Sequence, residues 1–91
     1  MNAEIAKSIT ASGIVRSGPG FYVGYVVTTA TATGAIIVYD GVTAAGTIVD
    51  VIPTTTAAGA KVNLASPVAL RTGLYADFSG GATGTVTFLY S

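Results

Sequence analysis

The chain has 91 residues, with four basic and four acidic side chains and zero net charge; it is 51% hydrophobic and contains no His, Cys or Trp. This length allows one domain. The balance of charges leaves nucleic-acid binding without an electrostatic basis. Because the chain has no Cys and no His, disulfides and structural zinc sites are excluded. A small domain with so few charges is expected to gain stability, and to cover its surface, by oligomerisation.

Residues 1–12 are predicted to form an N-terminal arm ahead of a single β-domain at residues 13–91. The spacing of its apolar residues, which include Ile5 and Ile9, is compatible with one or two turns of helix. A helix this short is marginal on its own. We therefore expect an extended or weakly helical arm that becomes ordered against a neighbour. The segment lacks the basic start and the apolar run of a secretory signal, so nothing in it predicts export.

Strand signals dominate after the arm, where Val, Ile and Thr are abundant and Gly and Pro punctuate the chain. The segments SGIVRS and FYVGYVVTT flank the turn sequence GPG and are predicted to form the first strand pair. In FYVGYVVTT a strict period of two places Tyr22 and Val26 on one face, and Tyr25 and Val27 on the other. Residues 17–39 carry no charge, but the Thr-rich centre TTATATG favours strands over a membrane span.

The segment AIIVY is apolar on both faces. Ile36 and Val38 share one face of the predicted strand, while Ile37 and Tyr39 share the other. An antiparallel sheet with one face in water should carry polar residues on that face. This strand is therefore expected to be covered on both sides or to belong to a subunit interface. It is predicted to form a hairpin with TIVDVIP across the turn-rich connection DGVTAAG.

The remaining segments also have the pattern of short strands. KVNLA and VALRT are predicted as two strands separated by Ser66 and Pro67. Alternation in LYADF and TVTFLYS places these residues on one face of each strand: Leu74, Ala76 and Phe78 in the first, and Val86, Phe88 and Tyr90 in the second. About eight short strands and no helical interval predict an all-β fold, a small antiparallel β-sandwich of the jelly-roll kind or a small barrel.

Few residues in the chain have the chemistry of a catalytic or metal site. General acid–base catalysis usually needs His or closely paired carboxylates. Asp40 lies in an Asp-Gly turn and is expected to accept backbone hydrogen bonds, whereas Asp50 and Asp77 are expected to face solvent or to pair with Arg71 or Lys61. A calcium site from Asp40 and Asp50 is conceivable, but no D-x-D spacing supports it. We therefore predict no catalytic residue, no metal ligand, no cofactor and no enzymatic activity.

The five Tyr residues permit two interpretations. Their rings could stack on a glycan, or they could be buried in subunit interfaces, where Tyr is enriched. The interface interpretation is favoured, and the residues assigned to it are Tyr22, Val26, Ile37 and Tyr39. The run TTATAT is similar to a fragment of the Thr ladder of ice-binding proteins, but a single copy cannot form a ladder.

Two stretches carry a resemblance to a known class of proteins. IIVYDGVTAAGTIVDVIP (36–53) and RTGLYADFSGGATGTVTFLYS (71–91) resemble small virion proteins of tailed bacteriophages, most of all capsid decoration, or cement, proteins. In these proteins a strand ending in Tyr-Asp crosses a T-A-A-G-T loop into an Ile/Val strand. A T-G-L-Y strand then precedes a Gly-rich turn and a C-terminal T-V-T-F-x-Y strand.

The resemblance implies a non-enzymatic virion component that is made in the host cytoplasm and attached to the capsid exterior. Its expected partners are further copies of itself, as a homotrimer, and the major capsid protein or another virion protein; no nucleic acid or membrane is involved. Ile5 and Ile9 of the arm are the expected contacts to the shell. The alternative is a tail or fibre module that binds a host receptor or glycan.

Overall fold

The computed structural model describes residues 5–91, which form eight strands. The strands are β1 (Ile5–Ile9), β2 (Gly13–Ser17), β3 (Gly20–Ala32), β4 (Ile36–Asp40), β5 (Thr47–Ile52), β6 (Lys61–Leu70), β7 (Gly73–Phe78) and β8 (Thr83–Tyr90). The one helical element in this range is the short 3₁₀ turn η1 (Ser79–Gly81). No helix of the described residues has the length and apolar character that a membrane crossing requires.

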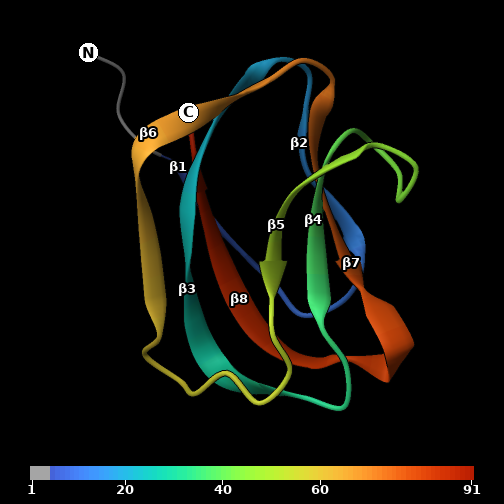
Figure 1. Ribbon diagram of the computed structural model, residues 1–91, viewed down its shortest axis with the longest axis vertical. Coiled ribbons are helices and arrows are strands. Elements are labelled where there is room, and N and C mark those ends of the chain that lie inside the picture. Colours follow the sequence, from blue (N-terminus) through green and yellow to red (C-terminus); the bar gives the residue numbers. More distant parts are fainter. Residues whose placement is uncertain (1–4) are drawn as a thin grey trace.

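The strands form two four-stranded antiparallel sheets that face each other (Figure 1). Sheet A has the order β1-β8-β3-β6, and sheet B has the order β2-β7-β4-β5. The first strand thus pairs with the last, the second with the seventh, the third with the sixth and the fourth with the fifth. This nested pairing, wrapped into two sheets, is the topology of a jelly roll. The predicted antiparallel β-sandwich is confirmed.

The N-terminal segment contributes the edge strand of sheet A. Residues 5–9 are extended, and β1 pairs in register with β8, from Ile5 opposite Tyr90 to Ile9 opposite Val86. Part of the predicted arm is therefore ordered against its own chain, and it is a strand with no helical turn. Residues 1–4 of the arm lie outside the described residues.

The number of strands agrees with the prediction. The predicted pairing of SGIVRS with FYVGYVVTT was wrong, because β2 and β3 lie in different sheets, and two further strands were assigned differently. The segments predicted as two strands around Ser66 and Pro67 are the single strand β6. Because β6 is an edge strand, it tolerates a proline that has no N–H to donate. The register with β3 shifts at this point, so that Tyr22 lies opposite Val68 and Gly24 opposite Asn63. The irregularity bends the strand without interrupting it.

The core lies between the two sheets and follows most of the predicted alternation. Ile36 and Val38 of β4 are fully buried, and Ile37 and Tyr39 are on the opposite face of the strand. In β7 the buried side chains are on the face that contains Leu74, and in β8 they are on the face that contains Phe88. These strands alternate regularly, so a period of two was sufficient to assign their inner faces.

Strand β3 departs from the predicted alternation because it contains a β-bulge. Its register with β8 shifts between Tyr22 and Gly24, and an extra residue in one strand reverses the face on which the following side chains lie. As a result Tyr22, Tyr25 and Val27 all point into the core. The prediction that Tyr22 shares a face with Val26, as a surface residue, was therefore wrong: Tyr22 is 0% exposed.

Candidate functional site

An apolar row crosses the outer face of sheet B. Ile14 of β2 lies opposite Tyr75 of β7, Tyr75 lies opposite Tyr39 of β4, and Tyr39 lies opposite Ile48 of β5. The two Tyr rings contact each other at a tilted angle of 54°, with centroids 6.5 Å apart. Aromatic cross-strand pairs of this kind stabilise a sheet, and here the pair lies at the centre of the row.

A second partial row widens this surface. Ile37 of β4 lies between Asp77 of β7 and Val51 of β5. We call the combined surface the apolar face; it consists of Ile14, Ile37, Tyr39, Ile48, Val51 and Tyr75. Three of its members are large apolar side chains that are close to half exposed: Ile14 at 45%, Ile48 at 54% and Val51 at 48%. A contiguous apolar patch of this type is typical of an interaction surface.

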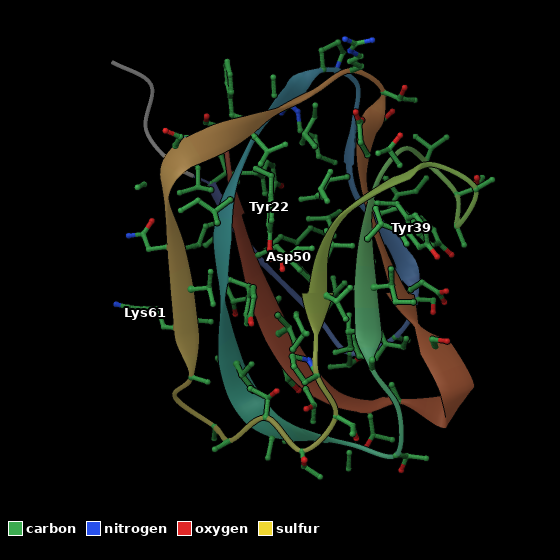
Figure 2. The ribbon with its side chains drawn as sticks, in the orientation of Figure 1. Tyr22, Tyr39, Asp50 and Lys61 are labelled. Carbon is green, nitrogen blue, oxygen red and sulfur yellow. The ribbon has the colours of Figure 1, made fainter. Side chains whose placement is uncertain are left out.

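The corresponding row on sheet A has a different composition. Ser8 of β1 lies opposite Thr87 of β8, Thr87 opposite Val26 of β3, and Val26 opposite Lys61 of β6. The Ser8 and Thr87 hydroxyls form a hydrogen bond at 2.6 Å, and Figure 2 shows Lys61 reaching outward from β6. This row of sheet A is therefore mostly polar, as expected of an antiparallel sheet in water, whereas the matching row of sheet B is apolar. Elsewhere on the outer face of sheet A, Phe21 is 46% exposed.

Asp50 lies on the edge strand β5 but points into the sandwich. Its Oδ2 accepts a hydrogen bond from the Tyr22 hydroxyl at 2.8 Å, and its Oδ1 accepts the backbone N–H of Val51 at 2.8 Å; Figure 2 shows Tyr22 and Asp50 meeting between the sheets. The expectation that Asp50 faces solvent or pairs with a basic residue was wrong, because the bulge at Val49 turns it inward. Burial, together with Asp50, raises the pKa of Tyr22.

Asp40 has the structural role that its turn sequence predicted. Its carboxylate accepts the backbone N–H groups of Arg71 at 3.1 Å, of Thr72 at 3.0 Å and of Gly73 at 3.4 Å. These bonds tie the end of β4 to the link between β6 and β7, and they hold the pKa of Asp40 below its ordinary value. The carboxylates of Asp40 and Asp50 are thus engaged by separate groups. Within residues 5–91 no three metal-ligating side chains come together.

The predicted interface residues do not form one surface. Ile37 and Tyr39 belong to the apolar face, Val26 lies on the outer face of sheet A, and Tyr22 is in the core. In Figure 2 Tyr39 lies on the side of β4 away from Tyr22. The prediction for Tyr22 is corrected accordingly, because a fully buried ring offers no surface to another molecule.

The two residues assigned to shell contact both lie on β1. Ile5 is 48% exposed, whereas Ile9 packs against the core cluster. Only Ile5 therefore has a large apolar surface available for a partner. The role of these residues as shell contacts stays a prediction.

Sequence reasoning missed four members of the apolar face: Ile14, Ile48, Val51 and Tyr75. The signal was present in part, since the segments containing them have apolar residues on both faces of the predicted strand. What the sequence did not show was that β2, β7, β4 and β5 are neighbours in one sheet.

The surface of the described residues offers the apolar face but no pocket. A binding site for a small substrate would normally be concave, so the site candidate of this chain is a sheet surface. Comparisons of the chain with protein-family models, with curated proteins and with solved structures find no match.

Proposed function

We propose that this chain is a non-enzymatic structural subunit of a bacteriophage virion, a capsid decoration protein that stabilises the shell by subunit–subunit contacts on its exterior. The observation that carries the proposal is the apolar face, which extends across all four strands of sheet B. The phage context rests on the resemblance of residues 36–53 and 71–91 to small virion proteins. The partners in this proposal are further copies of the chain and the major capsid protein.

The energetics of the face suit a contact that is repeated many times. Full burial of a Val or Ile side chain is worth about 1.5–3 kcal/mol, so each half-exposed member contributes roughly 1 kcal/mol when a partner covers it. Ile14, Ile48 and Val51 together then give only a few kcal/mol for each copy. A contact of this size is weak for an isolated pair, but it accumulates when many copies are held side by side on one particle.

The polar groups of the chain support a structural role. The carboxylates of Asp40 and Asp50 are occupied by backbone N–H groups and by the Tyr22 hydroxyl, and they lie in different parts of the sandwich. No buried polar side-chain atom among the described residues lacks a hydrogen-bond partner. Acid–base chemistry needs titratable groups that converge on a reacting atom, and these groups stabilise the fold.

The alternative, a tail or fibre module that binds a glycan, is favoured by one observation, the Tyr39–Tyr75 pair on the sheet surface. Against it, the flanking residues of the row are Ile14 and Ile48, which provide no hydrogen-bonding group for a sugar hydroxyl. The apolar ends of the row therefore favour a protein partner, although Asp77 lies beside the pair on the same face. Binding on a glycan array that disappears in Tyr39→Ala and Tyr75→Ala would support the alternative.

Co-sedimentation with purified particles of the phage that encodes the chain tests the proposal. We expect the wild type and Val26→Lys, which changes the polar outer face of sheet A, to bind the particles. Ile48→Lys should lose binding, since it places a charge in the apolar face. Particles that fail to bind the wild-type chain, or a density map of the intact virion without it, would overturn the proposal.

A further inference from the structure

We propose that a second copy of this chain packs on the apolar face, about a two-fold axis that runs along the row Ile14–Tyr75–Tyr39–Ile48. This inference deepens the proposed function, because it names the partner of one surface and the symmetry of the contact. It replaces the homotrimer that the resemblance implies with a two-fold contact. It rests on the composition of the row, on the charges beside it and on the edges of the sheets.

The row is suited to pack against a copy of itself. A two-fold interface brings the same patch of both subunits together, so the patch must be complementary to itself. Along the proposed axis each side chain meets its own counterpart: the Tyr rings meet Tyr rings and the terminal Ile side chains meet Ile. The row contains no charged residue, so this superposition creates no like-charge contact within it.

One pair of charges beside the row, Asp77 and Arg71, is complementary under the same rotation; the Asp40 carboxylate at the Arg71 end is already held by backbone N–H groups. On β7, Asp77 lies two residues beyond Tyr75 on the outer face, and Arg71 lies in the link that precedes the strand, on the other side of the row. The two-fold rotation exchanges the two sides. Each Asp77 is thereby brought toward the end of the sheet at which Arg71 of the second copy lies. Among residues 5–91, Asp77 accepts one hydrogen bond, a long one of 3.4 Å from Ser12 Oγ, which leaves other acceptor positions of the carboxylate open within that range.

The edges of the sheets are poorly suited to association by strand addition. On β5, the Asp50 carboxylate occupies the backbone N–H of Val51. Strand β6 carries Lys61 and Pro67, and β2 contains an irregular pairing at Val15. Strand β1, the other edge of sheet A, carries Lys7 opposite the buried Phe88. Charges, prolines and bulges are the usual devices that protect sheet edges. Association through a face is therefore the route that the fold leaves open.

The area of the face predicts a weak dimer. Four strands spaced about 4.8 Å apart, with five or six residues at about 3.3 Å each, give a face of roughly 350 Å² and hence roughly 700 Å² for two copies. Stable interfaces bury about 1,200–2,000 Å² in total. A dimer of free chains should therefore form only at high concentration, with a dissociation constant above about 10 μM. Copies held close together on a particle would have an effective local concentration high enough for the dimer to form.

Sedimentation equilibrium of the full chain between about 10 μM and 1 mM tests the proposal. We expect a reversible monomer–dimer equilibrium. Ile48→Lys should weaken it at least tenfold, because the two introduced charges face each other across the axis, and Tyr39→Lys should act in the same direction. Val26→Lys, at the matching row of sheet A, should leave the dimer unchanged. Far-UV circular dichroism of each variant confirms that the fold is retained.

A charge exchange tests the orientation of the two copies. Asp77→Lys should weaken the dimer, and the double variant Asp77→Lys with Arg71→Glu should restore it. Restoration is not expected if the copies are related by any rotation that leaves these two positions apart.

A chain that stays monomeric over the whole range, a trimer, or a dimer that persists in Ile48→Lys would overturn this inference. These outcomes are distinct from failure of the proposed function. A monomer that still binds particles leaves the decoration role intact, whereas a dimer of the expected symmetry that does not bind particles overturns that role and supports the inference.

Discussion

The Tyr22 hydroxyl donates a hydrogen bond of 2.8 Å to Asp50 Oδ2, and this bond joins the two sheets through the core. Tyr22→Phe removes the donor and leaves the inward-pointing carboxylate without it. We expect a loss of about 1–3 kcal/mol in the free energy of unfolding, measured by urea denaturation. Tyr75→Phe, which removes a hydroxyl from the outer face of sheet B, is the matched control and should stay within about 0.5 kcal/mol of the wild type.

The same Tyr makes the fold sensitive to alkali. The pKa of Tyr22 is raised in the folded protein, first by burial and then by Asp50, while in the unfolded chain it is about 10. Below pH 10 both states hold the proton and stability is unaffected; above it only the unfolded state releases the proton. The free energy of unfolding should then fall by about 1.4 kcal/mol per pH unit. Tyr22→Phe should reduce this slope, and an equal slope in the variant would contradict the assignment.

Asp40 should affect stability in acid. Backbone N–H groups of Thr72, Arg71 and Gly73 lower the pKa of Asp40 in the folded state. The contribution of Asp40 to the free energy of unfolding is therefore complete at a pH above the pKa of Asp in the unfolded chain, about 3.9. This contribution is lost as the pH falls through the lower pKa of the folded state. Asp40→Asn should cost about 1 kcal/mol at pH 7. Thermal unfolding as a function of pH checks this, because the difference between wild type and variant should shrink in the acid range.

Gly24 is required by the close approach of β3 and β6. A Cβ at this position would collide with the backbone carbonyl of Val62, whereas at Gly13 it would meet no atom within 4 Å. Gly24→Ala is expected to cost at least about 2 kcal/mol, because the backbone of β3 must move. Gly13→Ala is the control and should be close to neutral in the same denaturation experiment.

Residues of β5 should separate stability from association. Ile52 is fully buried and Ile48 is 54% exposed. Ile52→Ala should destabilise the fold by about 2–5 kcal/mol, whereas Ile48→Ser should leave the unfolding midpoint nearly unchanged and reduce binding to particles. A large loss of stability in Ile48→Ser would show that this side chain supports the fold of the single chain.

Local alternation predicted most of the sandwich, and it failed where the backbone leaves a regular strand. The faces of β4, β7 and β8 follow a period of two, but the bulge in β3 moved Tyr22 to the core, and the bulge at Val49 turned Asp50 inward. An interior glycine is a signal of a bulge, so Gly24 was the available clue.

The site was harder to predict than the fold, because it depends on which strands are neighbours. Ile14 and Tyr75 belong to the second and seventh strands, and only the nested pairing brings them together. The pattern of one strand shows that both of its faces are apolar. It does not show which other strands extend the patch.

The position of β8 also determines when the chain can fold. Strand β8 lies between β1 and β3 in sheet A, so β1 has no partner, and β3 lacks one of its two, until residues 83–90 have joined the sheet. Contacts between such distant segments slow folding, because the loop-closure entropy is lost before they form. The hairpin of β4 and β5 is the most local pair, and we expect it to form first. Sheet A is then completed only when β8 inserts between β1 and β3, so this insertion joins the two ends of the described range into one sheet.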